Sequence, residues 1–191
     1  MDYSVHPPSP FIQTHWQQLV PTWSQPVGSL LIVLQSSLCS FLDPSANTTQ
    51  QKQQLRQQFL EFGRVIAHQL QQKGYLAEVF DPCNGLPTLS PPGSLHLDDV
   101  AVVRNCLGYP TLPFHGCIVI LHPRWGGSTY PSTLMSSASP EVLQQVVDEV
   151  TRSQDKFGWL TDLPSDLTSP VEYETPALVS DSGDRVFEVL R

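Results

Sequence analysis

The stretch that decides the fold is LRQQFLEFGRVIAHQLQQKGYLAEVF, residues 55–80. In its first part large apolar residues recur three or four positions apart, which is the spacing of one face of an α-helix. These residues are Leu55, Phe59, Phe62, Ile66 and Leu70. Gly74 is a typical helix stop, and Tyr75–Phe80 then has the composition of a strand. A long amphipathic helix is therefore expected to lead directly into a strand.

The predicted helix begins near Thr48, which can form a capping box with Gln51. It then runs for more than twenty residues to Gly74. Gly63 in its interior costs about 1 kcal/mol relative to alanine. This glycine indicates either close packing at that position or no constraint at all.

The segments before this helix differ sharply in composition. Val27–Gln35 is rich in Leu, Ile and Val with little alternation, which predicts a strand covered on both faces. Residues 1–26 hold five of the 18 prolines and are interpreted as an N-terminal arm. Only Phe11–Val20 within the arm is continuous enough for a short helix.

The segments after residue 80 predict further strands and one helix. Asp99–Val103 fits a short strand or a helical turn equally well. Cys117–Leu121 predicts a strand, and Ser128–Met135 a second one, at an edge or with a bulge because of Pro131. Ser139-Pro140-Glu141 is a good helix start.

This order of elements is typical of an α+β domain, in which we expect a mixed sheet covered by helices. The domain is predicted to span residues 27–153. Residues 154–191 are rich in proline, aspartate, serine and threonine without periodicity, which indicates an acidic C-terminal tail. Val186–Leu190 has the strand character to add to a sheet or to dock on a partner.

The net charge of −8 is concentrated near the C-terminus. Residues 1–140 carry six Lys/Arg and seven Asp/Glu, a charge of −1, whereas residues 141–191 carry four and eleven, a charge of −7. Such a chain offers no basic surface to nucleic acid or to an anionic membrane. The longest apolar run, Leu30–Leu34, is too short to span a bilayer, and four scattered cysteines indicate reduced thiols. We therefore expect a soluble, cytoplasmic protein.

Familiar catalytic motifs are missing from the sequence. There is no G-x-G-x-x-G, no G-x-x-x-x-G-K-[ST] and no G-x-S-x-G, so nucleotide-binding and hydrolase functions have no support. Asp98-Asp99 is interpreted as a solvated pair or a helix cap, because adjacent residues of a strand point to opposite faces. The sequence itself therefore gives no reason to expect an enzyme.

The densest polar group is His115, Cys117 and His122, which suggests a metal site. If Cys117–Leu121 is a strand, His122 projects from the face opposite to His115 and Cys117, so the three cannot meet at one ion. On the residues alone Cys117 is interpreted as a small buried hydrophobe. Cys39, Cys83 and Cys106 are interpreted as buried or incidental thiols, and Trp125 as an interface anchor or a core residue.

Several segments occur together in a specific spacing over about 80 residues, from Phe59 to Pro140. They are Phe59–Tyr75, Phe80-Asp81-Pro82, Asn84-Gly85-Leu86, Leu107-Gly108-Tyr109, Cys117–His122, Trp125-Gly126 and Ala138-Ser139-Pro140. Their joint spacing resembles the C-terminal domain of the cblD-type (methylmalonic aciduria and homocystinuria type D) proteins of vitamin B12 trafficking.

The resemblance implies an α+β fold similar to flavin-dependent nitroreductases and flavin reductases, used without flavin and without catalysis. It also implies an adaptor that binds a cblC-type cobalamin-processing protein and directs the cofactor to B12-dependent enzymes such as methionine synthase. No cofactor is then expected to bind tightly to the chain alone. In the family a cysteine on the strand matching Ile118–His122 is implicated as a ligand to the cobalt of the partner's cobalamin, a role that carries over to Cys117. His115, His122 and Trp125 are expected near the contact surface.

The chain departs from the family pattern at one position that matters. The family has two adjacent cysteines where this sequence has Gly116-Cys117, so Cys117 matches either the functional cysteine or its neighbour. The alternative function is a flavin-dependent reductase, with Arg104 and Arg124 holding a phosphate. A thiol redox protein, a third class, would require two cysteines within reach of each other.

Overall fold

The structure is a computed structural model, and it describes residues 1–43 and 45–155. Its elements are β1 (Asp2–His6), α1 (Pro10–Leu19), β2 (Ser29–Ser36), α2 (Ala46–Gln72), β3 (Ala77–Val79), α3 (Asp99–Leu107), β4 (Thr111–Phe114), β5 (Cys117–Ile120), β6 (Thr129–Ser136) and α4 (Pro140–Asp155). The predicted tail beyond α4, with its strand candidate at Val186–Leu190, lies outside the described residues. No helix of residues 1–43 and 45–155 has both the length and the apolarity to cross a membrane.

The main sheet of the described chain has the strand order β1-β2-β6-β3, and every neighbouring pair in it is antiparallel. The α+β class is confirmed, whereas the expectation of a mixed sheet is wrong. The register shows why the sheet is not mixed. Ser29 of β2 and Ala77 of β3 both pair with Ser136 of β6, so β6 lies between the two strands. β2 and β3 run parallel at the two ends of a strand–helix–strand unit, but β6 is inserted between them and opposes both.

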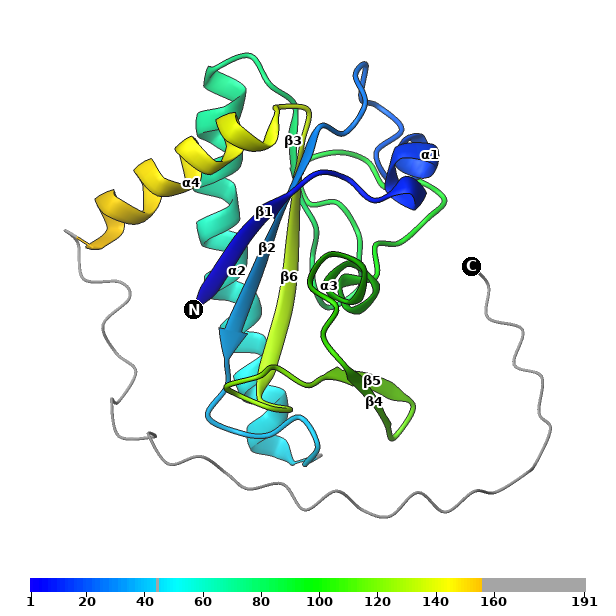
Figure 1. Cartoon of the computed structure of the whole chain (residues 1–191), viewed down its shortest axis with the longest axis vertical. Coiled ribbons are helices and arrows are strands. Elements are labelled where there is room, and N and C mark those ends of the chain that lie inside the picture. Colours follow the sequence, from blue (N-terminus) through cyan, green and yellow to red (C-terminus); the bar gives the residue numbers. More distant parts are fainter. Residues whose placement is uncertain (44, 156–191) are drawn as a thin grey trace. The chain divides into compact units, whose positions relative to one another are not determined.

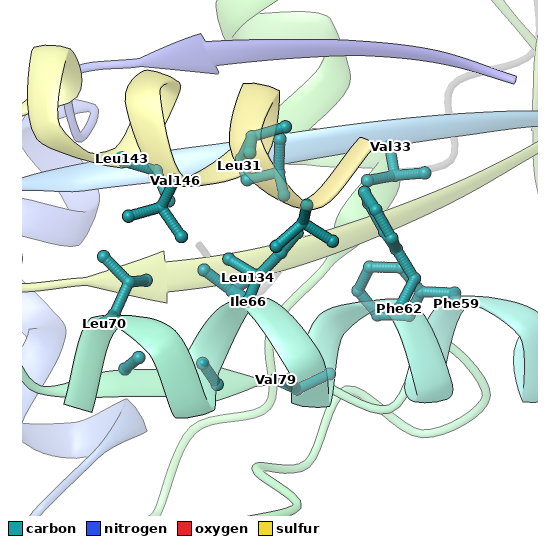
Figure 2. Close-up of a cluster of buried hydrophobic side chains, with 14 of the residues drawn as sticks. Leu31, Val33, Phe59, Phe62, Ile66, Leu70, Val79, Leu134, Leu143 and Val146 are labelled. Atoms are coloured by element: carbon teal, nitrogen blue, oxygen red, sulfur yellow. The ribbon is translucent and has the colours of Figure 1, made fainter. Parts of the chain in front are cut away.

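Strand β2 buries side chains on both of its faces, as predicted from its apolar run. Leu31 and Val33 lie in a core with α2 and α4. Leu30, Ile32 and Leu34 lie in a second core with α1 and α3. Figure 1 shows the two pairs of helices on opposite sides of the sheet, and Figure 2 shows apolar side chains of α2 and α4 meeting β2 and β6 in the first core.

Helix α2 begins earlier than the sequence predicts. Ser45 is its N-cap, with a side-chain oxygen that accepts a hydrogen bond from the Thr48 N–H at 3.3 Å. Thr48, predicted as the cap, is buried inside the first turn, and its hydroxyl donates to the carbonyl of Asp43. The C-terminal prediction is confirmed, because α2 ends at Gln72 and Gly74 follows with a φ of +86°.

The remaining predicted strands and the last helix are confirmed as β3, β5, β6 and α4. Strand β6 lies inside the sheet and so is not an edge strand as a whole, and its register with β2 has no bulge. Pro131 is nevertheless accommodated, since β3 pairs only with residues 134–136 while Pro131 pairs with Leu34 of β2 alone. At Pro131 the strand has a neighbour on one side only, which is where a residue without an N–H is tolerated.

Residues 1–26, interpreted as an arm, contribute two elements to this fold. The predicted short helix is confirmed as α1, with Ser9 as its N-cap and Pro10 at its first position. Residues 2–6 form β1, which pairs with β2 along its full length. The sequence gives little signal for β1, because its five residues DYSVH mix polar and apolar types and are all half-buried.

Gly63 of α2 packs directly against β3, which decides between the two interpretations of this glycine. A Cβ atom at Gly63 would lie 2.9 Å from Cγ1 of Val79, whose side chain is fully buried. We predict that Gly63→Ala lowers the free energy of unfolding by about 1–3 kcal/mol, because the overlap outweighs the gain of about 1 kcal/mol in helix propensity. In a Val79→Ala background the same change should lose most of this penalty. Chemical denaturation of the four proteins measures the coupling, and strictly additive effects would contradict the proposed contact.

Candidate functional site

Strands β4 and β5 form a short hairpin outside the main sheet, in which Phe114 pairs with Cys117. The two residues between them, His115 and Gly116, have φ angles of +46° and +78°. Positive φ at both positions is the signature of a type I′ turn, which suits the twist of a hairpin and favours glycine. The turn makes Cys117 the first residue of β5, and it places His115 at the tip rather than on the strand.

Cys117 is exposed, so its interpretation as a small buried hydrophobe is wrong. The pattern along β5 explains this, because its first two residues are exposed and its last two are buried. Val119, on the same face as Cys117, packs in a small cluster with Phe41 and Tyr130. The inner end of β5 is therefore anchored in the protein, while the end at the turn projects from it.

A cleft with a volume of about 1020 Å³ opens beside this hairpin. Its walls are the first half of α2, the turn at residues 82–85, the start of α3 and the hairpin itself. His115 and Cys117 line the hairpin wall, and Cys83 lines the turn. The volume is at the upper end of the range of roughly 300–1,000 Å³ that is usual for small-molecule sites.

Arg56 and Asp81 form a bidentate ion pair that joins α2 to the turn after β3. The Nε and Nη2 atoms of Arg56 each donate to one carboxylate oxygen of Asp81 at 2.6 Å. The Cys83 N–H donates to the same carboxylate at 3.0 Å. The hydrogen bonds from Arg56 hold the pKa of Asp81 below its usual value, so the pair is charged at neutral pH. This pair fixes the position of the turn that carries Cys83.

The segment left undecided between strand and helical turn is helix α3. Asp98 is its N-cap and accepts hydrogen bonds from the N–H groups of Val100 and Ala101, which confirms the cap interpretation for this residue. A solvated position is wrong for Asp99, which is buried at the cleft. Burial raises the pKa of Asp99 to about 7, against a smaller lowering by the Thr133 hydroxyl.

His122 and Trp125 lie together and do not line the cleft. Their rings stack with centroids 4.2 Å apart, and the ring of Tyr109 meets His122 edge-on at 5.3 Å. The Nδ1 atom of His122 accepts from the N–H groups of Arg124 and Trp125 at 3.2 and 3.3 Å. Burial lowers the pKa of His122, which favours the neutral ring that these bonds require. His122 thus organises the loop in which it lies.

The same loop is tied to the first strand through Asp2. Arg124 Nη2 donates to both carboxylate oxygens of Asp2, at 2.9 and 2.8 Å, and His122 Nε2 lies 3.6 Å from Asp2 Oδ2. Of the two arginines considered as phosphate ligands, Arg124 is thus already paired, and Arg104 lies in the last turn of α3. Neither of them lines the cleft. Of the predicted site residues, the structure brings His115 and Cys117 together and places His122 and Trp125 in a separate cluster.

The cysteines differ in their access to solvent. All four lie in the described residues as free thiols, with Cys83 and Cys117 exposed and Cys39 and Cys106 partly buried. Burial raises the pKa of the Cys106 thiol, which disfavours its reactive thiolate form. Residues 1–43 and 45–155 contain no group of three or more His, Cys, Asp or Glu side chains that could hold a metal ion. Cys83 and Cys117 are therefore the two thiols positioned to meet a ligand of the cleft.

Sequence reasoning missed three residues of the cleft, namely Cys83, Asp99 and Tyr130. Asp99 does have a signal, because in a helix it shares a face with Val102 and Val103, which lie three and four residues further on. Cys83 and Tyr130 have no local signal. The Arg56–Asp81 pair positions the turn that carries Cys83. The pairing of β6 with β2 positions Tyr130.

Comparison with known protein families gives a match over residues 2–148, to the family described as methylmalonic aciduria and homocystinuria type D protein. The matched region runs from β1 into α4 and contains the hairpin and the cleft. It confirms the resemblance that the joint spacing of segments indicates. Among curated proteins, none matches the chain.

The raised pKa of Asp99 predicts a pH-dependent stability. Its rise from 3.8 to about 7 means that the protonated carboxyl stabilises the fold fully below about pH 4, and that this contribution is lost as the pH rises through 7. Asp99→Asn should therefore have a higher free energy of unfolding than wild type at pH 8. The gain is on the order of 1.4 kcal/mol for each unit by which the pKa of Asp99 differs between the folded and unfolded states. The advantage should shrink at pH 5.

Urea titrations at the two pH values measure this difference. Asp98→Asn is the matched control, since Asn is as good an N-cap and Asp98 lies at the exposed end of α3. This control should show a much smaller gain at pH 8, because the charge of Asp98 raises the pKa of Asp99 less than burial does. A lower stability of Asp99→Asn at pH 8 than that of wild type would contradict the burial argument.

Proposed function

The chain belongs to the family of methylmalonic aciduria and homocystinuria type D proteins, and we propose that it is a non-catalytic adaptor of intracellular cobalamin trafficking. The family implies a role in cobalamin metabolism. The adaptor binds a cblC-type cobalamin-processing protein and directs the cofactor to a B12-dependent enzyme such as methionine synthase. It keeps the relation to flavin-dependent nitroreductases that the resemblance implies, but uses the fold for binding in the cytoplasm.

The observation that carries this proposal is the exposed Cys117 at the tip of a hairpin beside the cleft. A thiolate is a soft ligand that suits cobalt, and a hairpin tip can enter a partner's binding site without moving the sheet. The cobalamin is cargo held by the partner, and Cys117 is the ligand that this chain contributes to its cobalt. The chain alone needs no tightly bound cofactor for this role.

The surroundings of Cys117 suit contact with another protein. Ile118 and Leu112 lie on opposite faces of the same hairpin and are 48% and 41% exposed, so the hairpin presents apolar surface on both sides. His115 at the tip adds a polar group next to them. We place the partner contact on this hairpin, whereas His122 and Trp125 support it from the loop that follows.

The proposal predicts a spectral change when the chain meets a cblC-type protein loaded with cob(II)alamin. Wild type should shift the absorption spectrum to that of a thiolate-ligated corrinoid. Cys117→Ser should abolish the shift, because a hydroxyl is a poor ligand for this metal. Titration of the chain into the loaded partner, followed by absorption spectroscopy, measures the effect.

Cys83→Ser is the matched control, since Cys83 is the other exposed thiol of the same cleft. It should keep the full spectral shift. A wild-type mixture with an unaltered spectrum would sink the proposal, and a loss in Cys83→Ser with retention in Cys117→Ser would move the ligand to the other wall.

A further inference from the structure

Strand β1 is an edge of the main sheet that the described chain leaves without a second neighbour. The strand order is β1-β2-β6-β3, so β1 pairs with β2 on one side only (Figure 1). About half of its backbone N–H and C=O groups therefore point away from the sheet. Within residues 1–43 and 45–155, the backbone hydrogen bonds of loops and turns include none from residues 2–6. Nothing in this part of the chain pairs with the outer edge of β1.

The opposite edge of the sheet is covered, which sets β1 apart. The segment that follows β3 folds back on it, since the Thr88 N–H donates to the Val79 carbonyl at 3.0 Å. The N–H groups of Thr88 and Leu89 also donate to the Glu78 carboxylate, at 2.8 Å each. Natural proteins often protect an open edge with a proline, a lysine or a bulge. Strand β1 has none of these, because its sequence is DYSVH and its register with β2 is continuous.

The sequence of β1 is complementary to itself in an antiparallel pair. When two copies meet with Ser4 opposite Ser4, each Tyr3 lies opposite the Val5 of the other copy. Residues opposite each other in such a pair share one face of the sheet, and aromatic and β-branched side chains stabilise each other there. Tyr3 and Val5 already pack against the core with α2 and α4, so the pairing extends an apolar face.

The polar face of β1 is complementary in charge. In the same register each Asp2 lies opposite the His6 of the other copy, which brings a carboxylate to an imidazole. Nε2 of His6 lies 2.8 Å from the Ser4 hydroxyl of its own chain, so Nδ1 remains for this contact. The Asp2 side chain is 44% exposed and accepts two hydrogen bonds from Arg124, and a carboxylate has room for further donors. This match on both faces favours a second copy of the chain over an unrelated strand.

We propose that two copies of this chain pair through β1 and join their four-stranded sheets into one continuous sheet. The two-fold axis passes between the two Ser4 residues, so the interface is the same on both copies and closes at a dimer. Five residues from each copy make a small interface, and we expect a dissociation constant in the micromolar range. The Arg124–Asp2 pair ties this interface to the loop that follows the hairpin.

Charge substitutions at Ser4 test the pairing, because they bring like charges together at the two-fold axis. In analytical ultracentrifugation of the full chain, wild type should pass from monomer to dimer between about 1 and about 500 μM. Ser4→Lys and Ser4→Glu should each weaken the dimer by about tenfold or more. Their equimolar mixture should dimerise about as strongly as wild type, since an ammonium group then faces a carboxylate. Ser94→Lys, in an exposed loop, is the matched control and should dimerise like wild type.

A cysteine at the axis tests the register. Opposite residues of an antiparallel pair have Cα atoms about 4.5–5.5 Å apart, which is within the range of a disulfide. In a background with Cys83→Ser and Cys117→Ser, oxidised glutathione should therefore link Ser4→Cys into a covalent dimer. Ser94→Cys in the same background should stay unlinked.

A wild type that stays monomeric over this concentration range would overturn the proposal. So would Ser4→Lys and Ser4→Glu variants that each dimerise as strongly as their mixture. A dimer in which Ser4→Cys forms no link has its contact elsewhere and overturns the proposal as well. These measurements use no corrinoid, so the dimer and the adaptor function succeed or fail separately.

Discussion

Strand β6 lies between β2 and β3, although it follows β2 by roughly 100 residues in the sequence. It pairs with eight consecutive residues of β2 but with only three of β3. The long pairing creates the two faces on which α2 with α4 and α1 with α3 are packed. The short pairing leaves the first half of β6 without a second neighbour, and there Thr129, Tyr130 and Pro131 line the cleft. The position of the site thus follows from the unequal lengths of two strand pairs.

Two local devices then shape the walls of this cleft. The type I′ turn at His115-Gly116 gives the hairpin a fixed register, so that Cys117 is presented at its exposed end. The Arg56–Asp81 pair holds the turn with Cys83 against α2. One device depends on backbone conformation and the other on charge-assisted hydrogen bonds. Each positions a thiol, and at the hairpin the packing of Val119 against Phe41 and Tyr130 contributes as well.

Features that depend on neighbours in sequence could be predicted here, and those that depend on distant pairing could not. The periodicity of α2, the apolar run of β2 and the start of α4 are local signals, and all three elements are present. The antiparallel sheet and strand β1 depend on pairing between distant segments. Cys117 combines a predictable and an unpredictable feature. Its strand could be predicted from the local sequence, whereas its exposure depends on where the hairpin packs against Phe41 and Tyr130. His122 lies beside the predicted residues in sequence, yet Asp2 and Trp125 hold it in another cluster.

The insertion of β6 also has a kinetic consequence. During synthesis β2 and β3 leave the ribosome well before residues 129–136, so the facing edges of both strands stay unpaired until β6 has emerged. Closing so long a loop costs chain entropy before any pairing repays it, which makes non-local antiparallel sheets slow to fold. Until then the growing chain exposes an apolar strand edge to its surroundings, and such edges promote association between nascent chains. The architecture that creates the cleft therefore leaves the inner edge of β2 without its partner strand until late in synthesis.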